Sequence, residues 1–240
     1  MTQIDWFGVI EDDGKAQGWG FAGGAVCATA SGADAAEVMA QLGADTALIV
    51  RAGEAAQPVP CALRPDALPL GDLVQAAPLG RLPAPVRLHL LGLVTLHTNW
   101  DGVACVIGPD RSHWVQISAG EAVSFQSFLT PRLWHALNAG DAADAQAVAD
   151  TQSRPERLAT HLSSAELRGD FAAIAGHLIG AELSAARPYW LGQQVAVLGD
   201  SALVPAYCAA LAAQGVPVAT PENTAPAGLV GLRNAGRITP

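Results

Sequence analysis

The stretch Gly102-Val103-Ala104-Cys105-Val106-Ile107-Gly108 decides the fold class, because a short apolar run bounded by glycine is typical of a strand buried in a sheet. The runs Trp114–Ser118 and Ala122–Phe128 come next and flank Ala119-Gly120-Glu121, a pattern that predicts a hairpin. A second buried strand is expected at Gln194–Leu198, in a part of the chain whose pattern is otherwise helical. Strands interspersed with helices predict a mixed α/β protein.

The N-terminal part repeats the succession of strand, hairpin and helix. Residues 4–10 and 17–22 are rich in apolar and aromatic residues and are separated by Glu11-Asp12-Asp13-Gly14, so we expect a first hairpin there. A helix is expected over Ala35–Leu42, after a Ser-Gly-Ala-Asp sequence that can cap it, and a short buried strand over Thr46–Val50. The same succession in both halves predicts two lobes.

The rest of the chain divides into a proline-rich segment and a helical one. Prolines recur between Gln57 and Pro85 and leave little room for helix, whereas Leu88–Leu96 fits either a strand or a buried helix. Thr130 is expected to cap a helix with Pro131 at its first position. Further helices are expected at Ala142–Thr151, Pro155–Leu162, Asp170–Ala186 and Ala202–Gln214, and a last strand at Val216–Ala219.

Composition excludes several classes of partner. The 240 residues are 50% hydrophobic, 15% charged and carry a net charge of −9, with Lys15 as the single lysine. Nucleic acids and anionic membranes bind concentrated positive charge, so neither is expected as a partner. No apolar run is long enough to span a bilayer, and the N-terminus does not resemble a signal peptide, so we expect a cytoplasmic protein. Cys27, Cys61, Cys105 and Cys208 are widely spaced and are expected to be buried free thiols.

Isolated polar residues do not form a recognisable reaction centre. The histidines have no metal-binding spacing, and His177 lies in an apolar helix, which favours a satisfied core histidine. Ser112 and His113 are neighbours on a strand and therefore point to opposite faces, so they do not pair as nucleophile and base. No glycine-rich phosphate loop of a known pattern occurs. No catalytic and no metal-binding residue is therefore assigned.

Two features remain open. Glu182 is a lone acid in an apolar helix and is either a buried functional carboxylate or a boundary residue. Gly199-Asp200-Ser201 follows a buried strand and opens a helix, which is where α/β proteins collect anions and nucleotides, although a plain helix cap is the favoured explanation.

Several segments resemble one family, the 2-dehydro-3-deoxygalactonokinases, which are ATP-dependent sugar-acid kinases of the actin-like (ribonuclease-H-like) superfamily. The resemblance covers about residues 99–240 and is weaker before them. It rests on Trp100–Val103, Trp114-Val115, Val123–Thr130, Ser153–Ala159, Leu178–Leu183, Arg187–Trp190 and Val195–Gly199.

The resemblance implies a two-lobed actin-like α/β fold, with a reduced N-terminal lobe over residues 1–98 and a C-terminal lobe over residues 99–240. It implies phosphorylation of 2-dehydro-3-deoxygalactonate in galactonate catabolism, with ATP and Mg as cofactors. Gly199, Asp200 and Ser201 are then the nucleotide-binding residues, and Ser112 and Glu182 contact the substrate. The expected partners are a sugar acid or a nucleotide, with a homodimer as an open alternative.

The family's polar motifs are largely replaced in this chain. The acid of its first phosphate motif falls on Ile10, and its R-G-E-E-T-Q segment falls on Ala84–His89. Its second phosphate motif, P-G-T-H-[ST]-K-W, falls on Gly108–Trp114, and its M-T-G-E becomes Leu129–Arg132. Phosphoryl transfer needs backbone N–H groups, a metal-holding carboxylate and a base.

Two interpretations follow from these replacements. One is a divergent kinase that binds ATP through other residues, and the other is a pseudokinase that keeps the fold for binding, regulation or assembly. The loss of four motifs together favours the second. It also predicts that Glu11–Lys15 and Gly108–His113 do not form a phosphate cradle, since acidic side chains lie in both segments.

Overall fold

The computed structural model describes residues 3–12, 14–53, 55–66, 68–199 and 201–236. The chain divides into two compact units, unit 1 with residues 1–100, 118–123 and 223–240, and unit 2 with residues 101–117 and 124–222. These units differ from the expected division into residues 1–98 and 99–240. The end of the chain belongs to unit 1 because its last helix packs against the helix that precedes residue 97.

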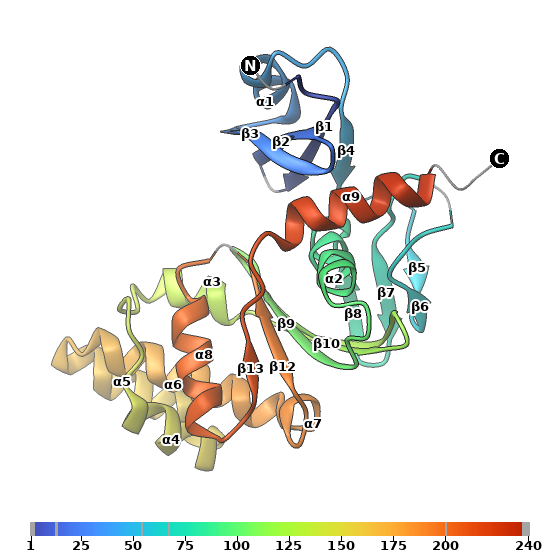
Figure 1. The fold of residues 1–240 in the computed structure, drawn as a ribbon. Coiled ribbons are helices and arrows are strands. Elements are labelled where there is room, and N and C mark those ends of the chain that lie inside the picture. The colour runs from blue at the N-terminus through green and yellow to red at the C-terminus, as the bar shows by residue number, and fades with distance from the viewer. Residues whose placement is uncertain (1–2, 13, 54, 67, 200, 237–240) are drawn as a thin grey trace. The chain divides into compact units, whose positions relative to one another are not determined.

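Unit 1 is built on a four-stranded sheet in the order β3-β2-β1-β4 (Figure 1). The antiparallel hairpin of β1 and β2 confirms the first expected hairpin, and β4 runs parallel to β1. The strand β3 follows as a third antiparallel strand that the sequence pattern did not indicate. The strands are β1 (Trp6–Asp12), β2 (Lys15–Ala22), β3 (Ala25–Gly32) and β4 (Leu48–Arg51).

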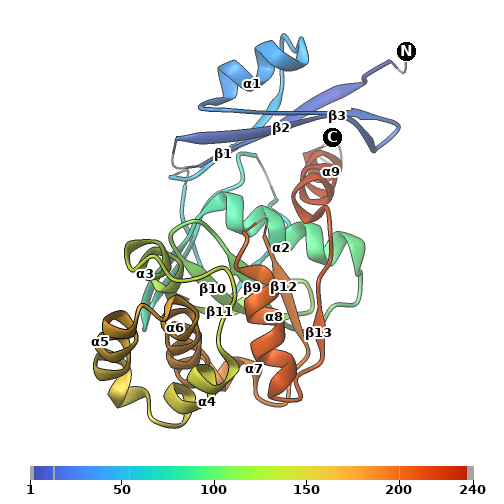
Figure 2. The same cartoon turned by 90° about the vertical axis from the view of Figure 1, so that its left-hand side faces the viewer.

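Helices cover this sheet on both faces. The helix α1 (Ala35–Leu42) packs Val38 against Val9 on one face (Figure 2), and Asp34 caps it by accepting the N–H of Glu37 at 2.8 Å. Phe21 lies in a second cluster with apolar residues of α2 (Ala84–Leu96) and α9 (Thr224–Gly236). The segment Leu88–Leu96, which fitted either a strand or a helix, is thus helical and buried on several sides.

A close crossing of α2 and α9 joins the end of the chain to unit 1 (Figure 1). At Gly92 a Cβ atom would overlap the carbonyl oxygen of Thr224. His89 Nδ1 also lies 2.8 Å from Thr224 Oγ1. The approach of the two backbones therefore requires glycine at position 92.

The proline-rich segment forms short strands and the start of α2. Asp72 is buried and accepts hydrogen bonds from the N–H of Ala84 at 2.7 Å and from Arg81 Nε at 2.6 Å. It thereby satisfies a free N–H at the N-terminus of α2, where Pro83 has no capping side chain. The strands are β5 (Gln57–Pro58), β7 (Leu73–Ala76) and β8 (Leu79–Leu82), which form one sheet, and β6 (Cys61–Ala62), which pairs with the start of β11.

Unit 2 contains a sheet in the order β13-β12-β9-β10-β11. Every residue of β9 is buried, and β12 runs parallel beside it with Val197 opposite Cys105, so the two expected buried strands are neighbours in one sheet. The hairpin of β9 and β10 is antiparallel. The strands are β9 (Gly102–Ile107), β10 (Ser112–Ser118), β11 (Glu121–Phe128), β12 (Val195–Leu198) and β13 (Val218–Ala219).

Helices of unit 2 pack around the central α6, which is apolar along most of its length. The helices α4, α5 and α6 gather on one side of the sheet (Figure 2). The helices are α3 (Thr130–Ala136), α4 (Ala145–Ser153), the short 3₁₀ helix η1 (Pro155–Arg157), α5 (Leu158–Arg168), α6 (Phe171–Ala185), α7 (Arg187–Trp190) and α8 (Val204–Ala213). The expected cap at Thr130 is wrong: α3 begins after Leu129 without a side-chain cap, because the Thr130 hydroxyl bonds to Glu182 instead.

The cysteines only partly match the expectation of buried thiols. All four are free, but Cys27 is exposed and only Cys105 is fully buried. Cys27 lies on β3, which has a neighbour on one side only and whose side chains are mostly exposed. Within the described residues, no helix is both long and apolar enough to cross a membrane.

Candidate functional site

The turn of the first hairpin lies between Asp12 and Lys15, which are opposite each other in the ladder of β1 and β2. Glu11 Oε2 lies 3.1 Å from Arg51 Nε and also accepts the N–H of Ala35 at 3.2 Å. Ile10 packs against the apolar cluster that contains α2 and α9. The carboxylate beside this turn is thus engaged within unit 1, and Asp13 lies outside the described residues.

The start of α2 buries an arginine. The Arg87 guanidinium is completely buried, and burial lowers its pKa. Its five N–H groups are all used: four contact oxygens and one faces the sulfur of Cys61 at 3.7 Å. The oxygens, at 2.7 to 3.2 Å, belong to Leu63, Gln57, Gly71 and Ala62. Arg87 therefore ties the proline-rich segment to α2 and leaves no donor for a ligand.

The turn between β9 and β10 is closed by its own groups. The N–H of Gly108 donates to the carbonyl of Arg111 at 2.8 Å. Asp110 Oδ2 lies 2.5 Å from Arg132 Nη2 of α3, and this hydrogen bond holds the pKa of the exposed carboxyl below its usual range. Arg132, where the resemblance places an acid of the family, thus pairs with an acid of the turn.

A buried carboxylate joins four elements of unit 2. Glu182 on α6 is 2% exposed, and its Oε1 accepts from Ser112 Oγ at 2.7 Å and from Trp114 Nε1 at 2.8 Å. Its Oε2 accepts from the Tyr207 hydroxyl at 2.8 Å, and Thr130 is the fourth donor. Burial raises the pKa of Glu182, although the four hydrogen bonds act in the opposite direction.

This cluster brings together the two residues expected to contact a substrate. Ser112 is completely buried like Glu182, and the two are hydrogen-bonded to each other. Sequence reasoning did not identify Tyr207 and Trp114 as partners of Glu182. Tyr207 is a lone tyrosine on the otherwise apolar α8. Because a buried hydroxyl requires a hydrogen-bond partner, this pattern could have indicated a buried acceptor nearby. The substrate role of Ser112 and Glu182 stays a prediction.

His113 points away from this cluster, as expected for the neighbour of Ser112 on a strand. Its Nδ1 lies 2.8 Å from Ser127 Oγ of β11. Burial, followed by the positive charge of Arg111, lowers its pKa to about 4. The ring is therefore neutral at physiological pH.

The turn after β12 contains the residues expected to bind a nucleotide. Asp200 lies outside the described residues. Ser201 Oγ accepts the N–H of Leu203 at 3.2 Å, just before α8 begins. Gly199 has φ +114°, and a Cβ there would lie 2.5 Å from the carbonyl oxygen of Ile107. Glycine at 199 is therefore required by the backbone, and a bulky replacement would disturb the junction of β9 and β12 rather than test binding alone.

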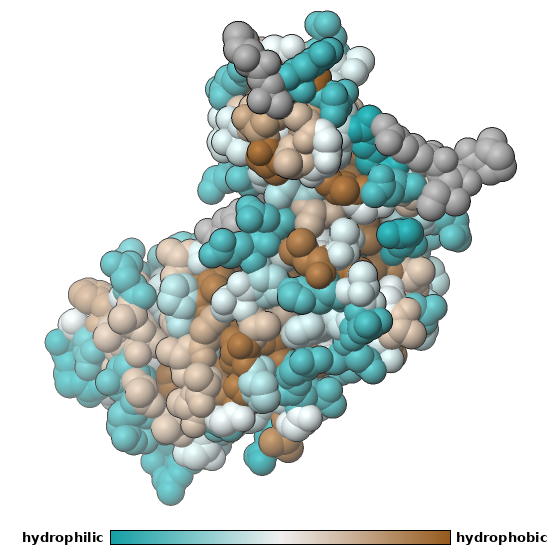
Figure 3. All heavy atoms as spheres, viewed as in Figure 1, coloured by the Kyte–Doolittle hydropathy of each residue, from teal (hydrophilic) through white to brown (hydrophobic). Residues whose placement is uncertain are grey.

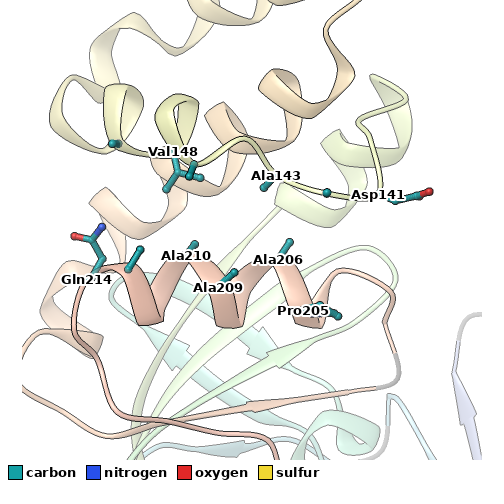
Figure 4. A pocket seen from close by; sticks show the side chains of 12 residues that line it. Asp141, Ala143, Val148, Pro205, Ala206, Ala209, Ala210 and Gln214 are labelled. Carbon is teal, nitrogen blue, oxygen red and sulfur yellow. The ribbon is translucent and has the colours of Figure 1, made fainter.

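A groove of about 390 Å³ lies between α4 and α8. Figure 4 shows the side chains of Ala206 and Ala210 on α8 facing Val148 and Ala143. The surface over α8 and the helices beside it is largely apolar (Figure 3). The groove begins beside the start of α8, where Pro205 lines it. It offers space for a flat apolar group and few polar partners.

No group of three or more His, Cys, Asp or Glu side chains among the described residues is arranged to hold a metal ion. Mg in the kinases is held largely through carboxylates and substrate phosphates. Two of the acids near the two turns, Glu11 and Asp110, are instead paired with arginines. Neither of these two carboxylates is therefore free to hold Mg.

Comparisons with solved structures show the fold. A protein from Sinorhizobium meliloti described as a 2-dehydro-3-deoxygalactonokinase superposes with a TM-score of 0.76 at 22% identity, over 97% of this chain and 98% of that chain. The activator of 2-hydroxyisocaproyl-CoA dehydratase from Clostridium difficile, solved with ADPNP, has a TM-score of 0.56 at 11% identity, over 97% and 96%. Component A of (R)-2-hydroxyglutaryl-CoA dehydratase from Acidaminococcus fermentans has a TM-score of 0.55 at 13% identity, over 97% and 99%. The expected actin-like α/β fold is confirmed.

The sequence comparison assigns the family. No curated protein matches the chain significantly. The family model described as 2-keto-3-deoxy-galactonokinase matches residues 88–233, which is more than half of the 240 residues. The chain therefore belongs to the 2-keto-3-deoxy-galactonokinase family.

Proposed function

We propose that this chain is a non-catalytic member of its family, a pseudokinase that keeps the kinase fold for binding, regulation or assembly. One observation supports this most directly. At three positions where the resemblance places acids of the family, the chain has Ile10, Arg87 and Arg132, and each side chain is used within the structure of its own unit.

The chemistry of phosphoryl transfer explains why these positions matter. Catalysis depends on positioning the phosphates and neutralising their charge with a metal ion and with N–H groups. Ile10 cannot hold a metal ion, and Arg87 is fully hydrogen-bonded inside unit 1. The N–H of Gly108 is already bonded within its turn, and Pro109 has none. Phosphorylation of 2-dehydro-3-deoxygalactonate is therefore the less favoured interpretation.

A second candidate function is nucleotide binding without transfer. It is supported by the groove between α4 and α8, which is lined by Pro205 at the start of the helix that follows Gly199 and Ser201 and has the volume to admit a nucleobase. In this interpretation the chain binds ATP and Mg without transferring phosphate, and the nucleotide is contacted by Gly199, Asp200 and Ser201.

The deciding experiment measures ADP release with ATP, Mg and 2-dehydro-3-deoxygalactonate. We expect no release above the rate without the sugar acid, with added ADP verifying that the coupled assay responds. Sustained, substrate-dependent ADP release would overturn the proposal and restore the kinase interpretation.

A thermal-shift measurement with ATP·Mg and ADP·Mg tests the second candidate separately. Ligand at a hundred times Kd stabilises by about 2.7 kcal/mol. For a chain of this length that corresponds to roughly 5–10 °C. Ala209→Trp fills the groove and is expected to abolish the shift, whereas Ala212→Trp, exposed on the same helix but outside the groove lining, is the matched control. An absence of any shift in the unmodified chain would exclude this candidate.

A further inference from the structure

Two histidine rings in unit 2 meet at one threonine hydroxyl. Thr151 of α4 is completely buried, and its Oγ1 lies 2.8 Å from His161 Nδ1 of α5 and 2.9 Å from His177 Nδ1 of α6. His177 Nδ1 also lies 3.1 Å from the carbonyl oxygen of Ala147. The ring centroids are 4.6 Å apart. This cluster of side chains connects three helices and belongs to none of the sites described above.

The direction of the hydrogen bonds follows from the carbonyl. A carbonyl oxygen only accepts, so we assign the proton of neutral His177 to Nδ1, which donates to Ala147 and Thr151. We assign the Thr151 hydroxyl as the donor to His161, whose Nδ1 then carries the lone pair. In this assignment the chain of donors runs from α6 through α4 to α5, and both rings are neutral.

An added proton disrupts this arrangement in either place. On His161 Nδ1 it removes the acceptor of the Thr151 hydroxyl, and on His177 it creates a buried cation beside the second ring. The charged groups that act on His177 are Asp150 of α4, which favours the cation, and Arg168 of α5, which disfavours it. Glu156 and Arg157 of η1, which also packs against α6, are exposed.

The same helix α4 forms one wall of the groove. Ala145, Val148 and Ala149 line it, whereas Thr151 and the carbonyl of Ala147 face the histidines. We propose that the hydrogen-bonded cluster of His161, Thr151 and His177, which we call the clasp, is sensitive to acid. It holds α4 against α5 and α6 and releases α4 on protonation, so that the width of the groove depends on pH. The clasp is a regulatory device of the fold and does not depend on whether the chain is a kinase or a pseudokinase.

The sign of the pH dependence follows from the environment of His177. Burial, and then the neighbouring His161, lower its pKa below the ordinary value of 6.5. The folded chain therefore resists a proton that the unfolded chain accepts. The contribution to stability is complete above about pH 6.5 and is lost as the pH falls below it towards the folded pKa.

Hydrogen exchange of the α4 amides, Ala145–Ser153, measures the release directly. Protection factors, corrected for the intrinsic exchange rate, are compared at pH 7.5 and pH 5.5. We expect protection of α4 to fall by up to about tenfold, because pH 5.5 lies one unit below the ordinary pKa of 6.5. Protection of α8, which forms the opposite wall, should change less. Equal protection of α4 at both pH values would overturn the proposal.

A double variant separates the clasp from other titrations such as that of His113. In His161→Asn/His177→Asn the amide groups can reproduce the acceptor at 161 and the donor at 177 but cannot be protonated. We expect this variant to lose less α4 protection between pH 7.5 and pH 5.5 than the unmodified chain, with the remaining loss due to His113, while His135→Asn, a change of an exposed histidine on α3, behaves like the unmodified chain. Equal loss of α4 protection in the double variant would also refute the clasp. If the double variant does not fold, the measurement on the unmodified chain still decides.

Discussion

Replacement of Glu182 tests how unit 2 holds its elements together. Two variants separate the role of the charge from the role of the acceptor. Glu182→Ala removes the acceptor from four buried donors, whereas Glu182→Gln keeps the shape and one acceptor oxygen but removes the charge.

The expected cost differs between the two variants. In Glu182→Ala, Trp114 keeps a buried N–H without an acceptor, which costs about 1–3 kcal/mol of stability. Each of the three hydroxyls loses a hydrogen bond worth about 1 kcal/mol. The sum is about 4–6 kcal/mol, which corresponds to a fall in Tm on the order of 10 °C.

Glu182→Gln should cost no more than about 1 kcal/mol. Burial raises the pKa of Glu182 more strongly than its hydrogen bonds lower it, so the uncharged form is not penalised by the site. For an acid with a raised folded pKa, stability is greatest below the ordinary value of 4.5 and declines as the pH rises through the folded pKa. This decline should be absent in Glu182→Gln.

Urea unfolding followed by circular dichroism and tryptophan fluorescence measures these differences. Glu166→Ala, a change of an exposed acid on α5, is the matched control and should lie within about 0.5 kcal/mol of the unmodified chain. If Glu182→Gln is as damaging as Glu182→Ala, the charge itself holds the cluster and the reasoning from acceptors is wrong.

Three further predictions concern single positions. Burial lowers the pKa of His113 from 6.5 to about 4, so the free energy of unfolding should fall by about 3 kcal/mol as the pH is lowered from 6.5 to 4. Urea unfolding of His113→Asn should show a flatter pH dependence over that range. Gly92→Ala forces a Cβ onto the carbonyl of Thr224 and should lower the free energy of unfolding by more than about 2 kcal/mol; a neutral effect in thermal melts would mean that α2 and α9 can move apart. Arg132→Ala breaks the exposed pair with Asp110, so the Tm should change by less than about 4 °C, and a larger drop would show a structural role beyond this pair.

Local sequence pattern was sufficient for the buried strands. The runs at Gly102–Ile107 and Gln194–Leu198 are apolar because β9 and β12 are covered on both faces, so their burial shows in the sequence itself. The strand Ala25–Gly32 was missed, since its small side chains lie mostly exposed at a sheet edge and alternate weakly. Leu88–Leu96 was ambiguous because α2 is buried on several sides and lost the periodicity of a surface helix.

Residues of the candidate site were easier to predict than their partners. Ser112 and Glu182 were both singled out, but their hydrogen bond joins residues 70 positions apart, and only tertiary structure brings them together. Thr130 was expected to cap α3 because a threonine before proline is a local signal for a cap. Its hydroxyl bonds to Glu182 instead, since a buried acid competes for every donor within reach. Contacts across the fold therefore overrode the local signal.

Three of the positions at which the resemblance places family acids also predict how the chain responds to attempts at restoration. Arg132→Glu would place a carboxylate beside Asp110, and like charges at that distance repel. Arg87→Glu would set a buried carboxylate among the oxygens that now accept from the guanidinium, leaving it without donors. Ile10→Asp would introduce a charge into the apolar cluster around α2 and α9. Each single restoration is thus expected to destabilise its own unit, because each replacement now makes contacts of its own. Restoring an acid would therefore require changes in its neighbours at the same time.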